Sequence, residues 1–133
     1  MGCDIHARYY VKTASGLREF QLEEHEEPGR SYPLFAALAG VQDAFGVVPI
    51  APPRGFPAEL AEHEPQDDVL HGASYLTLAE MLAYDWLGGA WQQDRGFGSA
   101  LHEYTAPFRN VTLPALARHG DPAQVLMVFI FDN

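Results

Sequence analysis

The sequence has little of what several common protein classes require. It contains one cysteine, Cys3, in 133 residues, which excludes an internal disulfide framework and any zinc site that needs two cysteines of one chain. Its longest apolar run, residues 125–131, is far shorter than the roughly 18 residues that cross a bilayer. Asp4 and His6 stand where a signal peptide has its basic and apolar regions. We therefore expect a cytoplasmic protein with no membrane partner.

Positive charge is also scarce, with 8 Lys and Arg against 18 Asp and Glu and a net charge of −10. This balance argues against binding to bulk nucleic acid, which requires clustered cations. The excess of acids lies entirely in residues 19–27 and 59–68, which hold ten carboxylates and no Lys or Arg. Elsewhere the charges balance, so a local site for a small anion stays possible. The acidic segments themselves suggest a basic host protein as an alternative partner.

Complete catalytic motifs are missing as well. The glycine-rich residues 88–98 lack the spacing of a dinucleotide or P-loop site. His71 and Ser74 lie close in sequence, yet no G-x-S-x-G elbow surrounds the serine. Whether the protein is an enzyme is left open, with non-enzymatic binding slightly favoured.

What is present predicts one α+β domain spanning residues 1–133. Residues 3–12 and 17–22 read as an antiparallel hairpin around a short turn. Residues 125–131 are apolar at every position, as expected of a central strand covered on both faces, and should neighbour the N-terminal strand. The fold class is therefore α+β, with a small antiparallel or mixed sheet and helices inserted between its strands.

The inserted region carries several helix signals. Residues 34–39 predict a short helix that ends at Gly40, and residues 58–63 predict another that opens at Pro57. Thr77 and Glu80 have the spacing of a capping box, with a helix expected to run to residue 86 or 87 and to end at Gly88-Gly89. Residues 71–75 read as a loop before that helix, residues 99–110 are ambiguous, and residues 113–119 predict a helical turn.

Three polar positions mark a first candidate site. Asp4 and His6 are two residues apart on a predicted strand, so their side chains project from one face. Such a pair supplies two ligands for a divalent metal, or a base with its orienting carboxylate. Asp132 follows the buried C-terminal strand and can approach Asp4 or His6, depending on strand direction. Antiparallel pairing of the two strands is instead expected to place Asp132 near Lys12, in a structural salt bridge. A purely structural role for these polar groups is the alternative.

A second candidate site would bind an anion. Arg30 and Arg54 each adjoin a glycine in a loop, where a guanidinium can clamp a carboxylate or phosphate. Pairing with surface acids is the alternative for both arginines. We add Tyr32, and also His71 and Ser74, whose side chains can donate beside the start of the predicted helix.

The opening Met1-Gly2-Cys3-Asp4-Ile5-His6 resembles that of a group of uncharacterised small bacterial and bacteriophage proteins. Further similarity lies in residues 30–35, 53–57 and 74–80 and in the terminal residues 129–133, which end in Phe-Asp-Asn. The resemblance implies a phage or mobile-element context and no particular chemistry. Because these segments coincide with the positions chosen above, we expect one site to hold Asp4, His6, Arg30, Arg54, Ser74 and Asp132.

Three functions follow from these observations. The favoured one is a binding protein that holds an anionic, nucleotide-like small molecule and so sequesters a host signal. The second is a metal-dependent hydrolase or lyase with Asp4, His6, His71 and Asp132 as ligands. The third is an acidic protein that binds a host protein or mimics nucleic acid. No heptad or dimer stripe indicates an oligomeric state.

Overall fold

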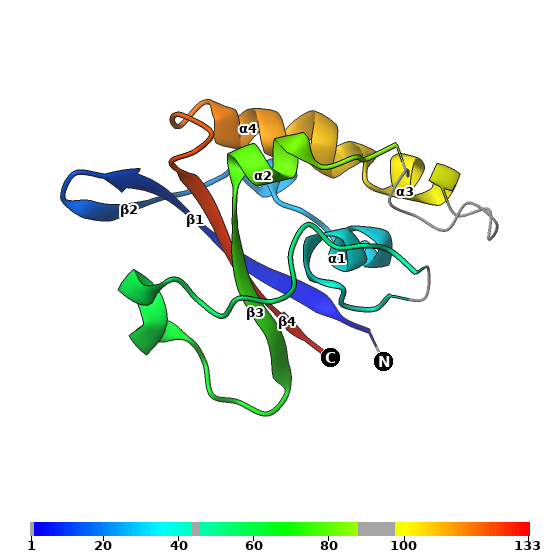
Figure 1. Cartoon of the computed structure of the whole chain (residues 1–133), viewed down its shortest axis with the longest axis horizontal. Coiled ribbons are helices and arrows are strands. Elements are labelled where there is room, and N and C mark those ends of the chain that lie inside the picture. Colours follow the sequence, from blue (N-terminus) through cyan, green and yellow to red (C-terminus); the bar gives the residue numbers. More distant parts are fainter. Residues whose placement is uncertain (1, 44–45, 88–97) are drawn as a thin grey trace.

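A computed structural model describes residues 2–43, 46–87 and 98–133, and the side chains of all of these except residues 98–100. Over this part of the chain the fold is a small α+β domain, as the sequence predicts, with helices gathered on one side of a sheet (Figure 1). Its strands are β1 (Asp4–Thr13), β2 (Gly16–Phe20), β3 (Leu70–Thr77) and β4 (Val125–Asp132). Its helical elements are η1 (Glu24–Glu26), α1 (Tyr32–Ala39), η2 (Ala58–His63), α2 (Leu78–Ala83), α3 (Gly98–Tyr104), η4 (Phe108–Thr112) and α4 (Leu113–Ala117).

The sheet has the strand order β2-β1-β4-β3, and every neighbouring pair is antiparallel. The predicted hairpin is β1 and β2, and the apolar C-terminal strand β4 is central with β1 as a neighbour, as expected. Because β1 and β4 are antiparallel, the start of one meets the end of the other, and Asp4 lies opposite Asp132. The expectation that antiparallel pairing places Asp132 near Lys12 is therefore wrong, because Lys12 lies at the opposite end of the strand pair. The start of β1 and the end of β4 therefore lie at the same end of the sheet (Figure 1).

One face of the sheet, which we call the helix face, carries the main core. Alternate residues of β4, namely Val125, Met127, Phe129 and Phe131, are fully buried there against α1, α2 and α4. The Phe131 ring meets Phe35 of α1 at 5.1 Å between centroids. Each fully buried side chain of this size contributes roughly 1.5–3 kcal/mol to folding.

The opposite face, which we call the open face, is covered only in part. Here Tyr10, Leu126 and Val128 pack against Phe56 and Leu60 from the connection between α1 and β3. The η2 turn in that connection lies away from the helices (Figure 1). The first half of β1 is left accessible on this face, which makes it available for binding.

The helix signals hold locally, with one difference. Thr77 and Glu80 form the predicted capping box, and Gly40 ends α1 in the left-handed conformation. The helix α2, however, ends at Ala83 rather than at residue 86 or 87, because Tyr84 is already extended. The predicted end at Gly88-Gly89 falls outside the described residues. Over the part of the chain that is described, no helix is long and apolar enough to cross a membrane.

The segment read as a loop, residues 71–75, is instead part of strand β3. It pairs with β4, with a register shift between His71 and Ser74. Gly72 lies at this irregularity with φ of +66°. The bulge interrupts the alternation of apolar and polar residues, and so it hides the strand from a pattern-based reading. Strand β3 is nevertheless paired with β4 on both sides of the bulge.

Candidate functional site

The ends of β1 and β4 bring four predicted residues into one group, which we call the strand-end cluster: Asp4, His6, Arg30 and Asp132. Asp4, His6 and Asp132 share the open face of the sheet. The Arg30 guanidinium donates from Nε and Nη2 to the two carboxylate oxygens of Asp4, at 2.9 Å each. The His6 Nε2 lies 2.5 Å from Oδ2 of Asp132. The cluster therefore consists of two neighbouring hydrogen-bonded pairs, Arg30 with Asp4 and His6 with Asp132.

The start of the chain is fitted closely to the segment that carries Arg30. The Cys3 backbone N–H donates to the Tyr32 hydroxyl at 3.0 Å, and the Cys3 side chain is fully buried. A Cβ on Gly2 would lie 2.2 Å from Nη1 of Arg30, so glycine makes room for the guanidinium. The hydrogen bond from Arg30 lowers the pKa of Asp4. The side chains of Arg30 and Asp4 are about half exposed, so this ion pair contributes little to the free energy of folding. Arg30 can therefore exchange Asp4 for another partner at little cost.

Arg54 does not belong to this cluster. It lies over the Tyr75 ring, 5.3 Å from the centroid, and its guanidinium binds both oxygens of Glu80 at 3.0 and 2.5 Å. Tyr75 pairs with Val128, four residues from Asp132 along β4, or about 13 Å. Hydrogen bonding to Arg54 lowers the pKa of Glu80 to about 2. Arg54 thus holds the open-face connection to the start of α2.

Ser74 and His71 are also separate from the strand-end cluster. Ser74 is fully buried, and its hydroxyl accepts the backbone N–H of Arg54 at 3.0 Å. His71 stacks on Phe131 with 6.2 Å between ring centroids, and its buried Nε2 has no hydrogen-bond partner among the described residues. Of the residues expected in one site, the structure brings together Asp4, His6, Arg30 and Asp132, and places Arg54 and Ser74 elsewhere.

A metal centre finds no support in this geometry. The carboxylate of Asp4 is occupied by Arg30, and that of Asp132 by His6. Among the described residues, no group of three or more His, Cys, Asp and Glu side chains is arranged to hold a metal ion.

A small pocket on the open face adjoins His6, and we call it the open-face pocket. It has a volume of about 200 Å³. Its polar side chains are His6, Arg8 and His63, and no acidic residue is among the described residues that line it. The aromatic rings of Tyr10 and Phe56 form part of its apolar wall. This pocket can accept a small anionic group.

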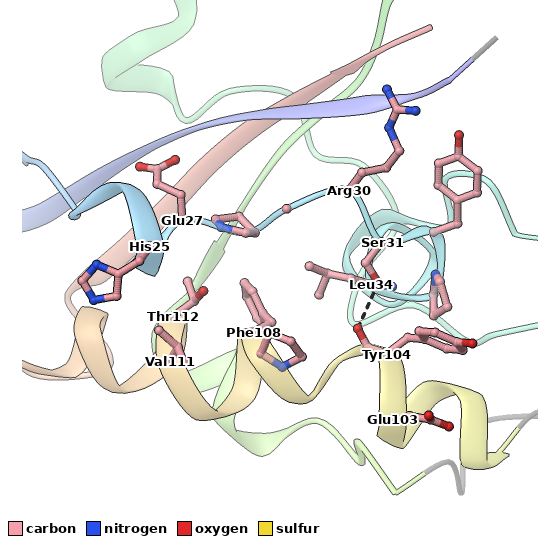
Figure 2. A pocket seen from close by; sticks show the side chains of 15 residues that line it. His25, Glu27, Arg30, Ser31, Leu34, Glu103, Tyr104, Phe108, Val111 and Thr112 are labelled. Atoms are coloured by element: carbon pink, nitrogen blue, oxygen red, sulfur yellow. Dashed lines mark hydrogen bonds between the residues drawn. The ribbon is translucent and has the colours of Figure 1, made fainter.

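A larger hollow lies on the other side of the Arg30 segment, and we call it the apolar cavity. It has a volume of about 670 Å³ and separates residues 27–34 from the helical residues 103–112 (Figure 2). Its walls are mainly prolines and large apolar side chains. They include Pro28, Pro33, Leu34, Pro107, Phe108 and Val111.

Two of the polar side chains that line this cavity, Ser31 and Thr112, are hydrogen-bonded to backbone carbonyls. The Ser31 hydroxyl donates to the carbonyl of Tyr104 at 3.1 Å and links the two walls (Figure 2). The Thr112 hydroxyl donates to the carbonyl of Glu26 at 2.7 Å. The Arg30 side chain extends away from the cavity toward β1 (Figure 2). The space between the walls is therefore suited to an apolar molecule.

The helical wall of this cavity was not identified from the sequence, where residues 99–110 were ambiguous. A signal was present, because the buried residues Leu101, Thr105, Phe108 and Thr112 follow helical spacing. Two of these four are threonines, which mask the apolar stripe. Each threonine donates its hydroxyl to a backbone carbonyl, which allows it to be buried.

Comparisons with protein-family models, with curated proteins and with solved structures find no match to this chain.

Proposed function

We propose that this protein binds a small organic molecule in the apolar cavity. The observation that carries the proposal is a hollow of about 670 Å³ with apolar walls in a chain of 133 residues. Small-molecule sites are concave, mostly apolar and roughly 300–1,000 Å³ in volume. An apolar ligand of one or two rings matches both the volume and the lining of the cavity.

The chemistry of the lining favours binding over turnover. The two aliphatic hydroxyls of the lining, on Ser31 and Thr112, donate to backbone carbonyls. A hydroxyl held in this way has no base to remove its proton, which nucleophilic catalysis requires. A binding protein of this kind acts by lowering the free concentration of its ligand. That role agrees with the phage or mobile-element context that the resemblance implies.

The test uses a neutral indole probe and a variant that fills the cavity. Val111 lines the cavity and is 39% exposed, so Val111→Trp places an indole in the space with little disturbance of the core. Leu82 on α2 is 51% exposed and is not among the cavity residues, so Leu82→Trp is the matched control.

Tryptophol, an indole with a short alcohol chain, is titrated into each protein and followed by amide chemical shifts. Tryptophol has about 12 heavy atoms, and a gain of about 0.3 kcal/mol per atom corresponds to a Kd in the millimolar range. Wild type and Leu82→Trp should bind, with shifts at residues 28–34 and 107–112, and Val111→Trp should not. Equal binding by all three, or shifts elsewhere, rejects the cavity as the site.

A second candidate is an anionic ligand at the open-face pocket. It is favoured by Arg8, by His6 and His63, which are cations only when protonated, and by the neighbouring rings of Tyr10 and Phe56. An anion bound there would share Arg8 with Glu19 and His6 with Asp132. An aromatic body carrying a phosphate or carboxylate matches this combination. It preserves the nucleotide-like ligand expected from the sequence, with a different set of residues to hold it.

Adenosine monophosphate and adenosine form the matched pair of probes for this candidate. The monophosphate should perturb the ring signals of His6 and His63, and His63→Gln should weaken its binding severalfold. His25→Gln, which changes a histidine outside this pocket, is the control. If adenosine binds as well as its monophosphate, or neither binds, the anionic ligand is rejected.

A further inference from the structure

The open-face pocket takes its basic side chains from two separate segments of the chain. His6 and Arg8 lie two residues apart on β1, so both project from the open face, with about 7 Å between their Cα atoms. His63 comes from η2 and lines the same pocket. Val128 and Ile130 of β4 pair with Arg8 and His6 and supply apolar lining. Because the pocket has a volume of only about 200 Å³, a phosphate bound in it lies near basic groups from both segments.

Both histidines of this pocket have a carboxylate neighbour outside its described lining. Nε2 of His6 lies 2.5 Å from Oδ2 of Asp132, and Nε2 of His63 lies 3.6 Å from Oε1 of Glu62. The bond to Asp132 assigns the proton of the neutral His6 ring to Nε2, so Nδ1 carries the lone pair and can accept a proton. When His63 is protonated and paired with Glu62, its Nδ1 has a proton to donate. The pocket therefore offers a proton acceptor and a proton donor.

Arg8 adds a permanent positive charge to these two histidines. Over the part of the chain that is described, its guanidinium is hydrogen-bonded only through Nε, to Glu19 at 3.0 Å. The two terminal nitrogens can therefore bind non-bridging oxygens of a phosphate. The rings of Tyr10 and Phe56 adjoin the basic groups and can contact a nucleobase. Cleavage of a phosphate ester by acid and base catalysis uses this set of groups.

We propose that the open-face pocket hydrolyses the cyclic phosphodiester of a nucleoside 2′,3′-cyclic phosphate. His6 accepts the proton of the attacking water, His63 donates a proton to the leaving ribose oxygen, and Arg8 binds the non-bridging phosphate oxygens. Asp132 is a positioning residue, because it contacts His6 and not the substrate. The inference rests on the anionic ligand considered for this pocket and is independent of the apolar cavity.

The step is balanced in atoms and electrons. The water oxygen forms a bond to phosphorus as one of the two bonds between phosphorus and a ribose oxygen breaks. His6 gains the proton of the water, His63 loses a proton to the ribose oxygen, and both rings return to their starting states by exchange with solvent. The product is a nucleoside monophosphate. A small substrate with one negative charge suits a chain of net charge −10 better than a strand of RNA does.

The experiment follows the hydrolysis of adenosine 2′,3′-cyclic phosphate by phosphorus NMR, in which the monoester product gives a separate signal. Wild type should convert the substrate, and His6→Gln and His63→Gln should each lower the rate about 100-fold or more. His102→Gln removes an exposed histidine outside the described lining of the pocket and should keep the wild-type rate. The native pattern of amide signals verifies that each variant is folded.

Asp132→Asn tests the positioning role separately. The substitution keeps the shape of the side chain and an accepting oxygen but removes the charge that faces His6. Because Asp132 does not contact the substrate, kcat should fall about tenfold while KM stays within twofold of wild type. A wild-type kcat in Asp132→Asn rejects this role.

The outcomes distinguish the activity from the binding on which it rests. If adenosine monophosphate binds to the pocket and wild type does not hydrolyse the cyclic nucleotide, the activity is rejected and the anionic ligand stands. If neither binding nor hydrolysis occurs, both fail together. Hydrolysis that persists unchanged in His6→Gln and His63→Gln does not come from this pocket and overturns the inference.

Discussion

The Arg54–Glu80 pair offers a stability test that can be worked through quantitatively. The Glu80 carboxylate accepts two hydrogen bonds from Arg54 and one from the backbone N–H of Thr77 at the start of α2. The substitution Glu80→Gln keeps the shape and one accepting oxygen, so the capping bond survives. It removes the charge on which the bond to Arg54 depends. We therefore expect a loss of stability that comes from this ion pair.

The size of the loss follows from the pKa of Glu80. The pKa falls from 4.5 to about 2 in the folded protein, and each unit corresponds to about 1.36 kcal/mol, which sets an upper bound near 3 kcal/mol. Arg54 and Glu80 are 31% and 33% exposed, and solvent screening reduces such interactions substantially. We expect Glu80→Gln to lower the free energy of unfolding by about 1–2 kcal/mol at pH 7.

The sign of the pH dependence is fixed by the direction of the shift. Because the folded pKa is depressed, the stabilisation is complete above pH 4.5 and is lost as the pH falls toward 2. Urea unfolding of wild type and Glu80→Gln should give a constant difference between pH 5 and pH 7. More than half of that difference, on the order of 1 kcal/mol, should be gone by pH 3.

A matched control is available in the Arg8–Glu19 pair. It joins an arginine that is 66% exposed to a glutamate through one 3.0 Å bond, so Glu19→Gln should cost less than about 0.5 kcal/mol. A difference below about 0.3 kcal/mol for Glu80→Gln, or one that does not shrink between pH 5 and pH 3, would refute the assignment of Arg54 as a structural clamp.

Three further predictions concern glycines and the cysteine. Gly72→Ala should lower the free energy of unfolding in urea by about 2–4 kcal/mol. Gly72 has φ of +66°, and a Cβ there would meet Val41 and Phe131 at 2.9 Å. Gly29 has open space around it, so the control Gly29→Ala should change the free energy of unfolding by less than about 0.5 kcal/mol. Gly2→Ala should displace Arg30 from Asp4, seen as a shift of the Arg30 Nε–H signal; an unchanged signal contradicts the close fit at the start of the chain. The Cys3 thiol is fully buried and burial raises its pKa, so a thiol reagent at pH 7 should label it only after unfolding, and rapid labelling of the native protein would contradict its burial.

The elements with local chemical signals could be predicted from the sequence. The capping box of Thr77 and Glu80, the left-handed Gly40 and the apolar run of β4 each depend on a few adjacent residues. Strand β3 could not be identified because the bulge at Gly72 breaks its alternation. The pairing of this edge strand with β4 joins residues far apart in the sequence, and local sequence patterns do not encode such pairing.

The candidate site was predicted in part for a related reason. Asp4, His6 and Asp132 lie together because two strand ends meet, and the sequence showed that each stands at a strand end. The pairing of Arg54 with Glu80 rather than with a ligand depends on how residues 51–69 cross the open face. The apolar cavity is formed by two segments about 70 residues apart in the chain, so no spacing in the sequence could reveal it.

The central claim is that the cavity between residues 27–34 and 103–112 binds a small molecule. The most direct measurement is the titration of tryptophol into wild type, Val111→Trp and Leu82→Trp, followed by amide chemical shifts. The amide signals of residues 28–34 and 107–112 should shift in a saturable way in wild type and Leu82→Trp, and should not shift in Val111→Trp. Saturable binding that Val111→Trp leaves intact, or no binding to wild type at any soluble concentration, would contradict it.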